Sequence, residues 1–311
     1  MPSSKPALLI LPPHLGMLTA FLEPDFTVWR FWEGPPVEAV GVIGALVVAG
    51  EFPIDKAFAE SLPKLGLIAC FTTGYDGVDL DWARSRGLKV SHSPGVNHED
   101  VADHAIGLML GAWRRIVAGD KMVRSGGWKS TAKMQTASLA GRKVGIVGLG
   151  DIGAAIARRC EAFGLEVSWW GPREKPQAPW PRAASLADLA ASCDILMVAC
   201  LANEETLGLI SRPVIDALGP EGLLVNVSRG KVVDEDALIE ALKDGRLGMA
   251  ALDVFQTEPT PSSRWADAPN TVLTPHTAGA TTGAIPKMVA LTRENLRRFF
   301  AGEPLANPVV E

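Results

Sequence analysis

The sequence contains little cysteine. Its four cysteines, Cys70, Cys160, Cys193 and Cys200, include no pair separated by two residues, and they lie in apolar runs. This pattern is typical of small buried side chains in a reducing compartment and argues against the disulfide framework of a secreted domain. The chain also lacks the ligand spacing of a zinc site, so we expect no metal.

The sequence also has no excess of positive charge and no long apolar run. Its 30 basic and 35 acidic residues are scattered and give a net charge of -5. A stripe of basic residues that could bind a phosphate backbone is therefore missing, and we expect no nucleic-acid partner. The apolar run from Ala7 to Leu11 ends at Pro12, far short of signal-peptide or membrane-spanning length. We therefore expect a cytoplasmic protein without membrane association.

The remaining composition is that of a folded protein. Hydrophobic residues make up 47% of the 311 residues, and the chain is too poor in glycine and proline to be of low complexity. At the usual domain size this length favours two domains. Short apolar runs alternate with helical stretches, which is typical of parallel sheets covered by helices. The fold class predicted is α/β.

Two series of apolar runs predict two doubly wound parallel sheets. The first series covers residues 7–11, 27–32, 45–49, 67–71 and 89–91, and the second covers residues 143–147, 166–170, 195–199, 223–226, 249–252 and 272–274. Residues 97–124 lie between the two series. Glu99 and Asp100 open a predicted helix there, which we expect to connect the two domains. The amphipathic stretch Pro286 to Phe300 is expected to return to the first domain. We therefore expect a substrate domain of residues 1–97 plus 286–311, with a dinucleotide-binding domain of residues 98–285 inserted in it.

A glycine-rich turn follows the first strand of the second series. The turn is Gly148-Leu149-Gly150-Asp151-Ile152-Gly153, and a helix follows it. Between a strand and a helix, the first glycine permits the tight turn, the second lets the backbone approach a pyrophosphate, and the third lets helix pack on strand. The free N–H groups of the helix favour phosphate. The alternative, a glycine-rich turn without a ligand, is less consistent with these flanking elements.

The next strand ends without the acidic residue that usually binds the ribose of NAD. Gly171, Pro172 and Arg173 follow Trp170 instead. Without the carboxylate a 2′-phosphate is not repelled, and Arg173 can pair with it. We therefore predict a preference for NADPH, with NADH possible. Alternatively, Arg173 is a solvated loop residue and Gly171 only part of a turn.

Three polar segments each follow a strand of the second series. They carry Arg229, Glu258 and His276. Ligands of open α/β sheets bind outside the carboxyl ends of the strands, so the three segments are expected to face the crevice that holds the cofactor.

Here the chain resembles the D-2-hydroxyacid dehydrogenase family, and within it the glyoxylate and hydroxypyruvate reductase branch. The resemblance spans nearly the whole chain and rests on residues 73–76, 78–80, 101–105, 148–153, 226–230, 252–255, 258–259 and 274–276. It implies two Rossmann-like domains, one inserted in the other, with a cleft between them. It also implies an NAD(P)-dependent enzyme that reduces small 2-oxo acids.

The resemblance implies a role for each polar residue. Reduction of a 2-oxo acid requires a hydride donor, a proton donor and a cation that orients the carboxylate. Arg229 would bind the substrate carboxylate and carbonyl through its planar fork. His276 would be the general acid, and Glu258 beside it would favour the imidazolium and fix the ring.

Further contacts follow from the same resemblance. Thr73 and Gly74 would donate backbone N–H groups to the substrate carboxylate. The loop that contains Gly50 and Phe52 would face the substrate, and Phe52 is the candidate for setting substrate size.

On the cofactor side, Asp253 and Gly279 resemble the nicotinamide contacts of the family. His104 and Asp103 also recur in the family pattern. Their helix has an apolar period, so we expect His104 to serve packing and hydrogen bonding.

Alternatives remain open. Larger 2-oxo acids, such as aromatic pyruvates or 2-keto sugar acids, would need the same chemistry. Formate oxidation is disfavoured, because formate dehydrogenases of the superfamily carry glutamine where Glu258 stands. Phosphoglycerate dehydrogenases commonly have a C-terminal regulatory extension, which we do not expect here. A dinucleotide-sensing protein similar to corepressors is a further alternative, although it would be expected to carry partner-binding extensions.

Relatives dimerise through an arm that corresponds to residues 113–134, which predicts a homodimer.

Overall fold

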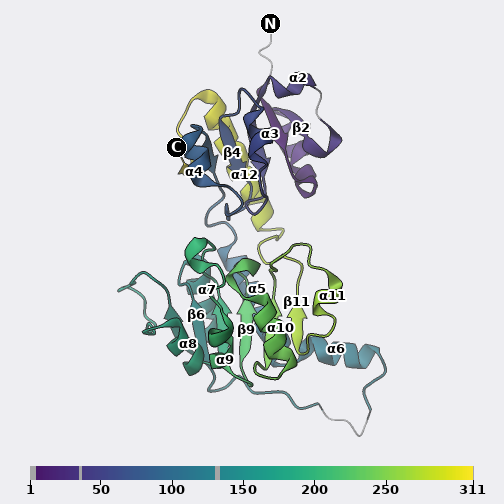
Figure 1. Cartoon of the computed structure of the whole chain (residues 1–311), viewed down its shortest axis with the longest axis vertical. Helices are drawn as coiled ribbons and strands as arrows, with labels where there is room; N and C mark the ends of the chain where they lie inside the picture. The colour runs from purple at the N-terminus through teal and green to yellow at the C-terminus, as the bar shows by residue number, and fades with distance from the viewer. Residues whose placement is uncertain (1–4, 35–36, 130–133, 311) are drawn as a thin grey trace. The chain divides into compact units, whose positions relative to one another are not determined.

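The chain folds into two α/β units, each built on one six-stranded sheet (Figure 1). The structure is a computed structural model and describes residues 5–34, 37–129 and 134–310. One unit comprises residues 1–97 and 282–311, and the other comprises residues 98–281. The second unit therefore interrupts the sequence of the first. The predicted fold class, with two parallel-sheet α/β units, is confirmed.

The sheet of the first unit has the strand order β12-β5-β4-β3-β1-β2, and all pairs are parallel except β12 with β5. Its strands are β1 (Ala7–Ile10), β2 (Thr27–Arg30), β3 (Ile43–Val48), β4 (Leu67–Cys70), β5 (Lys89–Ser91) and β12 (Pro308–Val310). Its helices are η1 (Pro13–Leu18), α1 (Thr19–Leu22), η2 (Phe31–Glu33), α2 (Val37–Val40), α3 (Lys56–Glu60), α4 (Leu80–Ser85) and α12 (Ala284–Ala301). The sequence did not predict β12, a three-residue edge strand that begins with proline.

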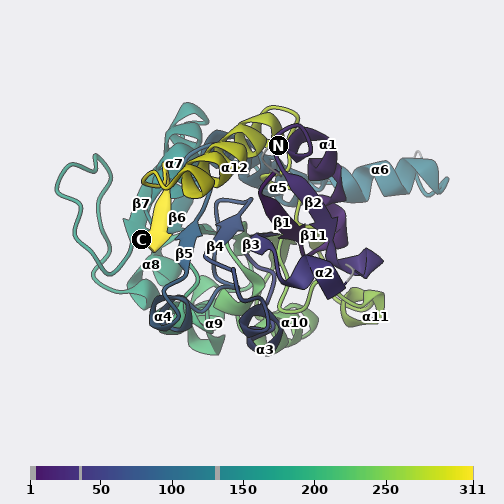
Figure 2. The same ribbon diagram turned by 90° about the horizontal axis from the view of Figure 1, so that it is seen from above.

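Alternate residues of these strands enter two separate hydrophobic cores. Leu8 of β1 belongs to the core formed with α1 and α12, whereas Leu9 belongs to the core formed with helices α2, α3 and α4. Figure 2 shows α12 and α1 on one side of the sheet and α3 and α4 on the other. Because both faces are covered, the central strands β1, β3 and β4 are apolar and fully buried, as the sequence pattern indicated.

The sheet of the second unit is entirely parallel, with the order β11-β10-β9-β8-β6-β7. Its strands are β6 (Lys143–Val147), β7 (Glu166–Trp170), β8 (Ile195–Val198), β9 (Leu223–Asn226), β10 (Met249–Leu252) and β11 (Thr271–Leu273). Its helices are α5 (His98–Trp113), α6 (Ile116–Arg124), α7 (Asp151–Ala162), α8 (Leu186–Ser192), η3 (Glu204–Thr206), α9 (Arg212–Leu218), η4 (Gly230–Val232), α10 (Glu235–Lys243) and α11 (Ser262–Trp265). Helices α5 and α7 cover one face, and α8, α9 and α10 cover the other.

The stretch predicted as a connecting helix is divided in two. Helix α5 ends at Trp113, and α6 begins at Ile116 after Arg115, whose φ of 51° lies in the left-handed region. Residues 130–133 of the predicted dimer arm lie outside the described residues. Within the described part of the chain, no helix combines the length and the apolar character needed to cross a bilayer.

Candidate active site and cofactor site

The glycine-rich turn joins β6 to α7 and brings backbone segments into close contact. Gly148 has a φ of 89°, and its N–H donates a hydrogen bond of 2.8 Å to the carbonyl of Trp170. A Cβ atom at Gly148 would lie 2.5 Å from Cα of Cys200, and one at Gly153 would lie 2.1 Å from the carbonyl oxygen of Gly148. Both positions therefore exclude side chains.

Gly150 is different because it faces open space. It is the N-cap residue of α7, and a Cβ atom there would have no neighbour within 4 Å. Open space directly in front of the N–H groups of a helix is what a bound pyrophosphate requires. The glycines of this turn therefore fit a dinucleotide cofactor, with Gly148 and Gly153 closing the turn and Gly150 leaving room for the phosphates.

A small cavity of about 80 Å³ lies at the carboxyl ends of β6, β7 and β8. Its lining residues include Gly148 after β6, Gly171 after β7 and Cys200 after β8. Strand β6 pairs with β7 on one side and β8 on the other, so this edge is the topological switch point where such sheets bind nucleotides. Burial raises the pKa of the Cys200 thiol to about 11, so the thiol is protonated at neutral pH and is not a nucleophile there.

The loop after β7 is held by an arginine that the sequence analysis did not identify. The guanidinium of Arg182 donates a hydrogen bond of 2.7 Å to the carbonyl of Gly171 and lies 5.7 Å from the ring centroid of Trp169. Arg173, the predicted partner of a 2′-phosphate, is exposed two residues after Gly171.

His276 and Glu258 are brought together as predicted. Nδ1 of His276 lies 2.6 Å from Oε2 of Glu258, and each side chain is 29% exposed. The N–H of Phe255 donates to the other oxygen, Oε1, at 2.9 Å. An ionised carboxylate can only accept hydrogen bonds, so Nδ1 of His276 donates to Glu258, and Nε2 is the ring nitrogen that does not face this carboxylate.

Asp253 lies beneath the turn that carries His276. Its side chain is buried, and its carboxylate accepts the hydroxyl of Thr274 at 2.6 Å and the N–H groups of Thr277 and Ala278 at 2.9 Å each. Burial by itself would raise the pKa of Asp253, but these hydrogen bonds and one with His104 outweigh it, and the pKa lies below its usual value.

His104 has the hydrogen-bonding role that the sequence predicted. Its Nε2 lies 2.9 Å from the hydroxyl of Thr274 and 3.3 Å from Oδ1 of Asp253. Helix α5 is thereby tied to the turn of His276, a connection that no local motif revealed. Gly279 follows this turn and is partly exposed.

The segment of Arg229 is shaped by a buried asparagine. Asn226, the last residue of β9, accepts the N–H of Ser228 at 3.0 Å and donates to the carbonyl of Arg229 at 3.1 Å. Nη1 of the half-buried Arg229 donates to the carbonyl of Ser228 at 2.8 Å. A Cβ atom at the next residue, Gly230, would lie 1.8 Å from the carbonyl carbon of Phe255. The Arg229 segment therefore packs directly against the start of the Glu258 loop.

The loops proposed for substrate binding in the first unit also contact each other. The N–H of Gly50 donates to the hydroxyl of Thr72 at 2.8 Å, and a Cβ atom at Gly50 would lie 1.6 Å from the carbonyl oxygen of Gly74. Phe52 is half-buried and packs against both hydrophobic cores of this unit.

Thr73 is fixed by its side chain. Its hydroxyl lies 2.8 Å from the carbonyl oxygen of Ser93 and 3.0 Å from Oδ1 of Asn97. Within the described ranges, the N–H groups of Thr73 and Gly74 make no hydrogen bond to the protein, so both can bind an anion.

Comparison with known families is consistent with this geometry. Residues 106–278, more than half of the chain, match the family described as D-isomer specific 2-hydroxyacid dehydrogenase, NAD binding domain. The matched region contains the glycine-rich turn, Arg229, Glu258 and His276.

Individual proteins are similar over almost their whole length. The chain is 40% identical to hydroxyphenylpyruvate reductase of Plectranthus scutellarioides, covering 97% of this chain and 98% of that protein. It is 39% identical to a glyoxylate/hydroxypyruvate reductase A of Arabidopsis thaliana, with the same coverage. Among solved structures, the NADPH-dependent glyoxylate/hydroxypyruvate reductase of Sinorhizobium meliloti, in complex with NADP and malonate, superposes with a TM-score of 0.91 at 33% identity, covering 98% of this chain and 97% of that one.

Proposed function

The chain belongs to the D-isomer specific 2-hydroxyacid dehydrogenase family, and from this premise we propose that it reduces glyoxylate and hydroxypyruvate to D-2-hydroxy acids with NADPH. The observation that carries the proposal is the contact of 2.6 Å between His276 and Glu258 in the unit that also contains the open glycine turn. An acid held by a carboxylate and a dinucleotide site are the two parts that hydride reduction of a carbonyl requires.

The proposed mechanism assigns one task to each side chain. When bound, the nicotinamide supplies the hydride that attacks the carbonyl carbon. His276 donates a proton from Nε2 to the carbonyl oxygen, while Glu258 holds the ring through Nδ1. Arg229 orients the substrate carboxylate and polarises the carbonyl. In the first unit, the N–H groups of Thr73 and Gly74 are the proposed donors to a carboxylate.

The family resemblance makes Asp253 a nicotinamide contact, but we propose that its carboxylate has a different role. Both carboxylate oxygens are already engaged by Thr274, Thr277 and Ala278. The side chain therefore serves the turn of His276, and the contact with the nicotinamide falls to the surrounding backbone and to Gly279.

The preference for NADPH over NADH rests on the loop after β7. None of residues 171–173 is acidic, so no carboxylate there repels a 2′-phosphate. The side chain of Arg173 is exposed, and the described residues show no internal partner that it would have to give up to pair with that phosphate. The NADP-bound relative from Sinorhizobium meliloti supports the same preference. One feature opposes it, since Glu205 also lines the small cavity at this edge.

A second candidate keeps the reaction and changes the substrate. The similarity to a hydroxyphenylpyruvate reductase favours aromatic 2-oxo acids, and 2-keto sugar acids need the same chemistry. Phe52, half-buried between two cores, is the residue we propose to limit substrate size.

A steady-state panel of 2-oxo acids with NADPH and with NADH tests these proposals. We expect the highest kcat/KM for glyoxylate or hydroxypyruvate with NADPH. A higher value for hydroxyphenylpyruvate or 2-ketogluconate would establish the second candidate, and equal or better use of NADH would contradict the cofactor preference. Cofactor binding without turnover of any 2-oxo acid would instead indicate a dinucleotide-sensing protein.

We further propose a cytoplasmic homodimer. The four cysteines are free, which is consistent with a reducing compartment. Ile116, Val117, Val123 and Trp128 in the predicted arm are 50 to 70% exposed and offer apolar surface to a second copy. A single species with the mass of one chain in sedimentation velocity would refute the dimer.

A further inference from the structure

A buried carboxylate lies behind the loop that carries Glu258. Glu235 is the first residue of α10 and is only 4% exposed. Its Oε2 accepts the backbone N–H of Gln256 at 2.9 Å, and its Oε1 forms an ion pair with the guanidinium of Arg264. Burying a carboxylate is costly unless it is paired and hydrogen-bonded, and Glu235 meets both conditions.

The loop that Glu235 contacts passes from a buried residue to exposed ones. Residues 256–258 are exposed, so packing alone does not fix them. Phe255, just before them, is buried, and its ring centroid lies 5.6 Å from that of Trp265. The hydrogen bond from Gln256 to Glu235 therefore ties the first exposed residue of this loop to α10.

The backbone of Phe255 and Gln256 contacts both catalytic segments. The N–H of Phe255 donates to Glu258, which in turn contacts His276. The next peptide group, between Phe255 and Gln256, touches Gly230, where a Cβ atom would lie 2.3 Å from the nitrogen of Gln256. Displacement of this peptide would therefore disturb both the Arg229 segment and the partner of His276.

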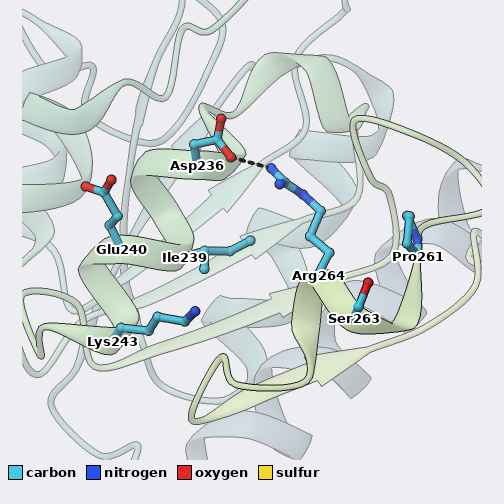
Figure 3. A pocket seen from close by; sticks show the side chains of 7 residues that line it. All are labelled: Asp236, Ile239, Glu240, Lys243, Pro261, Ser263 and Arg264. Carbon is cyan, nitrogen blue, oxygen red and sulfur yellow. Dashed lines mark hydrogen bonds and ion pairs between the residues drawn. The ribbon is translucent and has the colours of Figure 1, made fainter.

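The neighbouring acidic residue provides a natural control. Figure 3 shows the side chain of Arg264 extended toward Asp236 on α10, and Nη2 of Arg264 lies 2.7 Å from Oδ1 of Asp236. The Asp236 side chain is 79% exposed and shows no hydrogen bond to residues 255–258. Asp236 thus shares the arginine with Glu235 but does not hold the catalytic loop.

We propose that Glu235 is a positioning residue that places Glu258 against His276 through the backbone of Gln256. The inference rests on the proposed function, since it assigns a purpose to the position of Glu258. Glu235 touches neither the substrate nor the cofactor in this account. It acts through the loop, and the ion pair with Arg264 orients its carboxylate.

The test compares Glu235→Ala, Glu235→Gln, Asp236→Asn and Glu258→Gln with the wild type. We expect Glu235→Ala to lower kcat roughly 10- to 100-fold, the size of effect that small displacements of catalytic groups produce. The Kd for NADPH should stay unchanged, because the glycine turn is untouched. Glu235→Gln keeps an oxygen that can accept the N–H of Gln256 and should restore most of the rate. Asp236→Asn should behave as the wild type.

A readout independent of turnover separates this inference from the proposed function. The ring of His276 is followed through a pH titration by NMR and assigned with a His276→Gln variant. Its titration midpoint in Glu235→Ala should move from the wild-type value toward that of Glu258→Gln, and Asp236→Asn should leave it in place.

A wild-type midpoint in folded Glu235→Ala, or an equal displacement in Asp236→Asn, would overturn the positioning role. Failure of the proposed function would look different: the wild type would reduce no 2-oxo acid, while the titration would still report whether Glu235 holds the loop.

Discussion

At the scale of the residue, the orientation of the His276 ring, the proposed general acid, depends on an unusual backbone conformation. His276 has a φ of 51°, in the left-handed region, where a residue other than glycine costs about 1–3 kcal/mol unless its surroundings hold it. Its N–H donates to the carbonyl of Asp253 at 2.8 Å, and the Asp253 carboxylate binds the next two N–H groups. Asp253 thus stabilises the turn from which the ring reaches Glu258.

This arrangement gives a prediction for Asp253→Asn. The folded pKa of Asp253 lies below that of an unfolded carboxyl, so its contribution to stability is complete above about pH 4 and is lost as the pH falls through the folded pKa. We expect the variant to lose about 1–3 kcal/mol of unfolding free energy at neutral pH, the cost of leaving buried donors unsatisfied. Its stability should also depend less on pH in the acidic range. Denaturant unfolding at several pH values measures both, and parallel pH dependences of variant and wild type would contradict this role.

How far a residue's role could be predicted depended on whether its partners are local in sequence. Arg229, Glu258 and His276 each follow a strand and form motifs that can be read directly. Glu235 and Arg182 act through backbone groups of distant loops, at Gln256 and Gly171, so their roles depend on tertiary contacts that no spacing reveals.

At the scale of the element, the turn between β6 and α7 assigns different tasks to its glycines. A side chain at Gly153 would strike the carbonyl of Gly148, whereas a side chain at Gly150 would point into open space. The same substitution should therefore have different consequences at the two positions. At Gly153 it affects the packing of the helix on the strand, and at Gly150 it affects the space in front of the helix.

We predict that Gly153→Ala lowers the unfolding free energy by about 1–3 kcal/mol, as overpacking typically does. Gly150→Ala should leave stability nearly unchanged, because its φ of -81° suits alanine, but should weaken NADPH binding. Thermal unfolding and calorimetric titration with NADPH separate the two effects. If Gly150→Ala bound NADPH as tightly as the wild type, the cofactor site would not lie at this turn.

Elements were predictable where a long pattern defined them. Eleven strands in the described part of the chain correspond to apolar runs in the sequence, because strands of a sheet covered on both faces are built mainly from apolar residues. The edge strand β12 has only three residues and lacks such a pattern. Helices α5 and α6 are separated at Arg115, which adopts the left-handed conformation. Glycine or asparagine would have indicated that conformation in the sequence, whereas arginine does not.

At the scale of the whole molecule, one unit is inserted in the sequence of the other. The second unit contains the glycine turn, Arg229, Glu258 and His276, and the first contains Thr73 and Gly74. The number of domains followed from the chain length. Their nesting depends on α12, which packs in the core of the first unit although it follows the second in sequence.

The central claim is that this chain transfers a hydride from a nicotinamide to the carbonyl carbon of a 2-oxo acid, with His276 as the acid. The most direct measurement uses hydroxypyruvate and NADPH that carries deuterium at the transferred position, with wild type and His276→Ala compared. We expect D-glycerate labelled at C2, formed about 100- to 10,000-fold more slowly by the variant, the usual contribution of a general acid. Unlabelled product, the L-isomer, or an unchanged rate in His276→Ala would contradict the account.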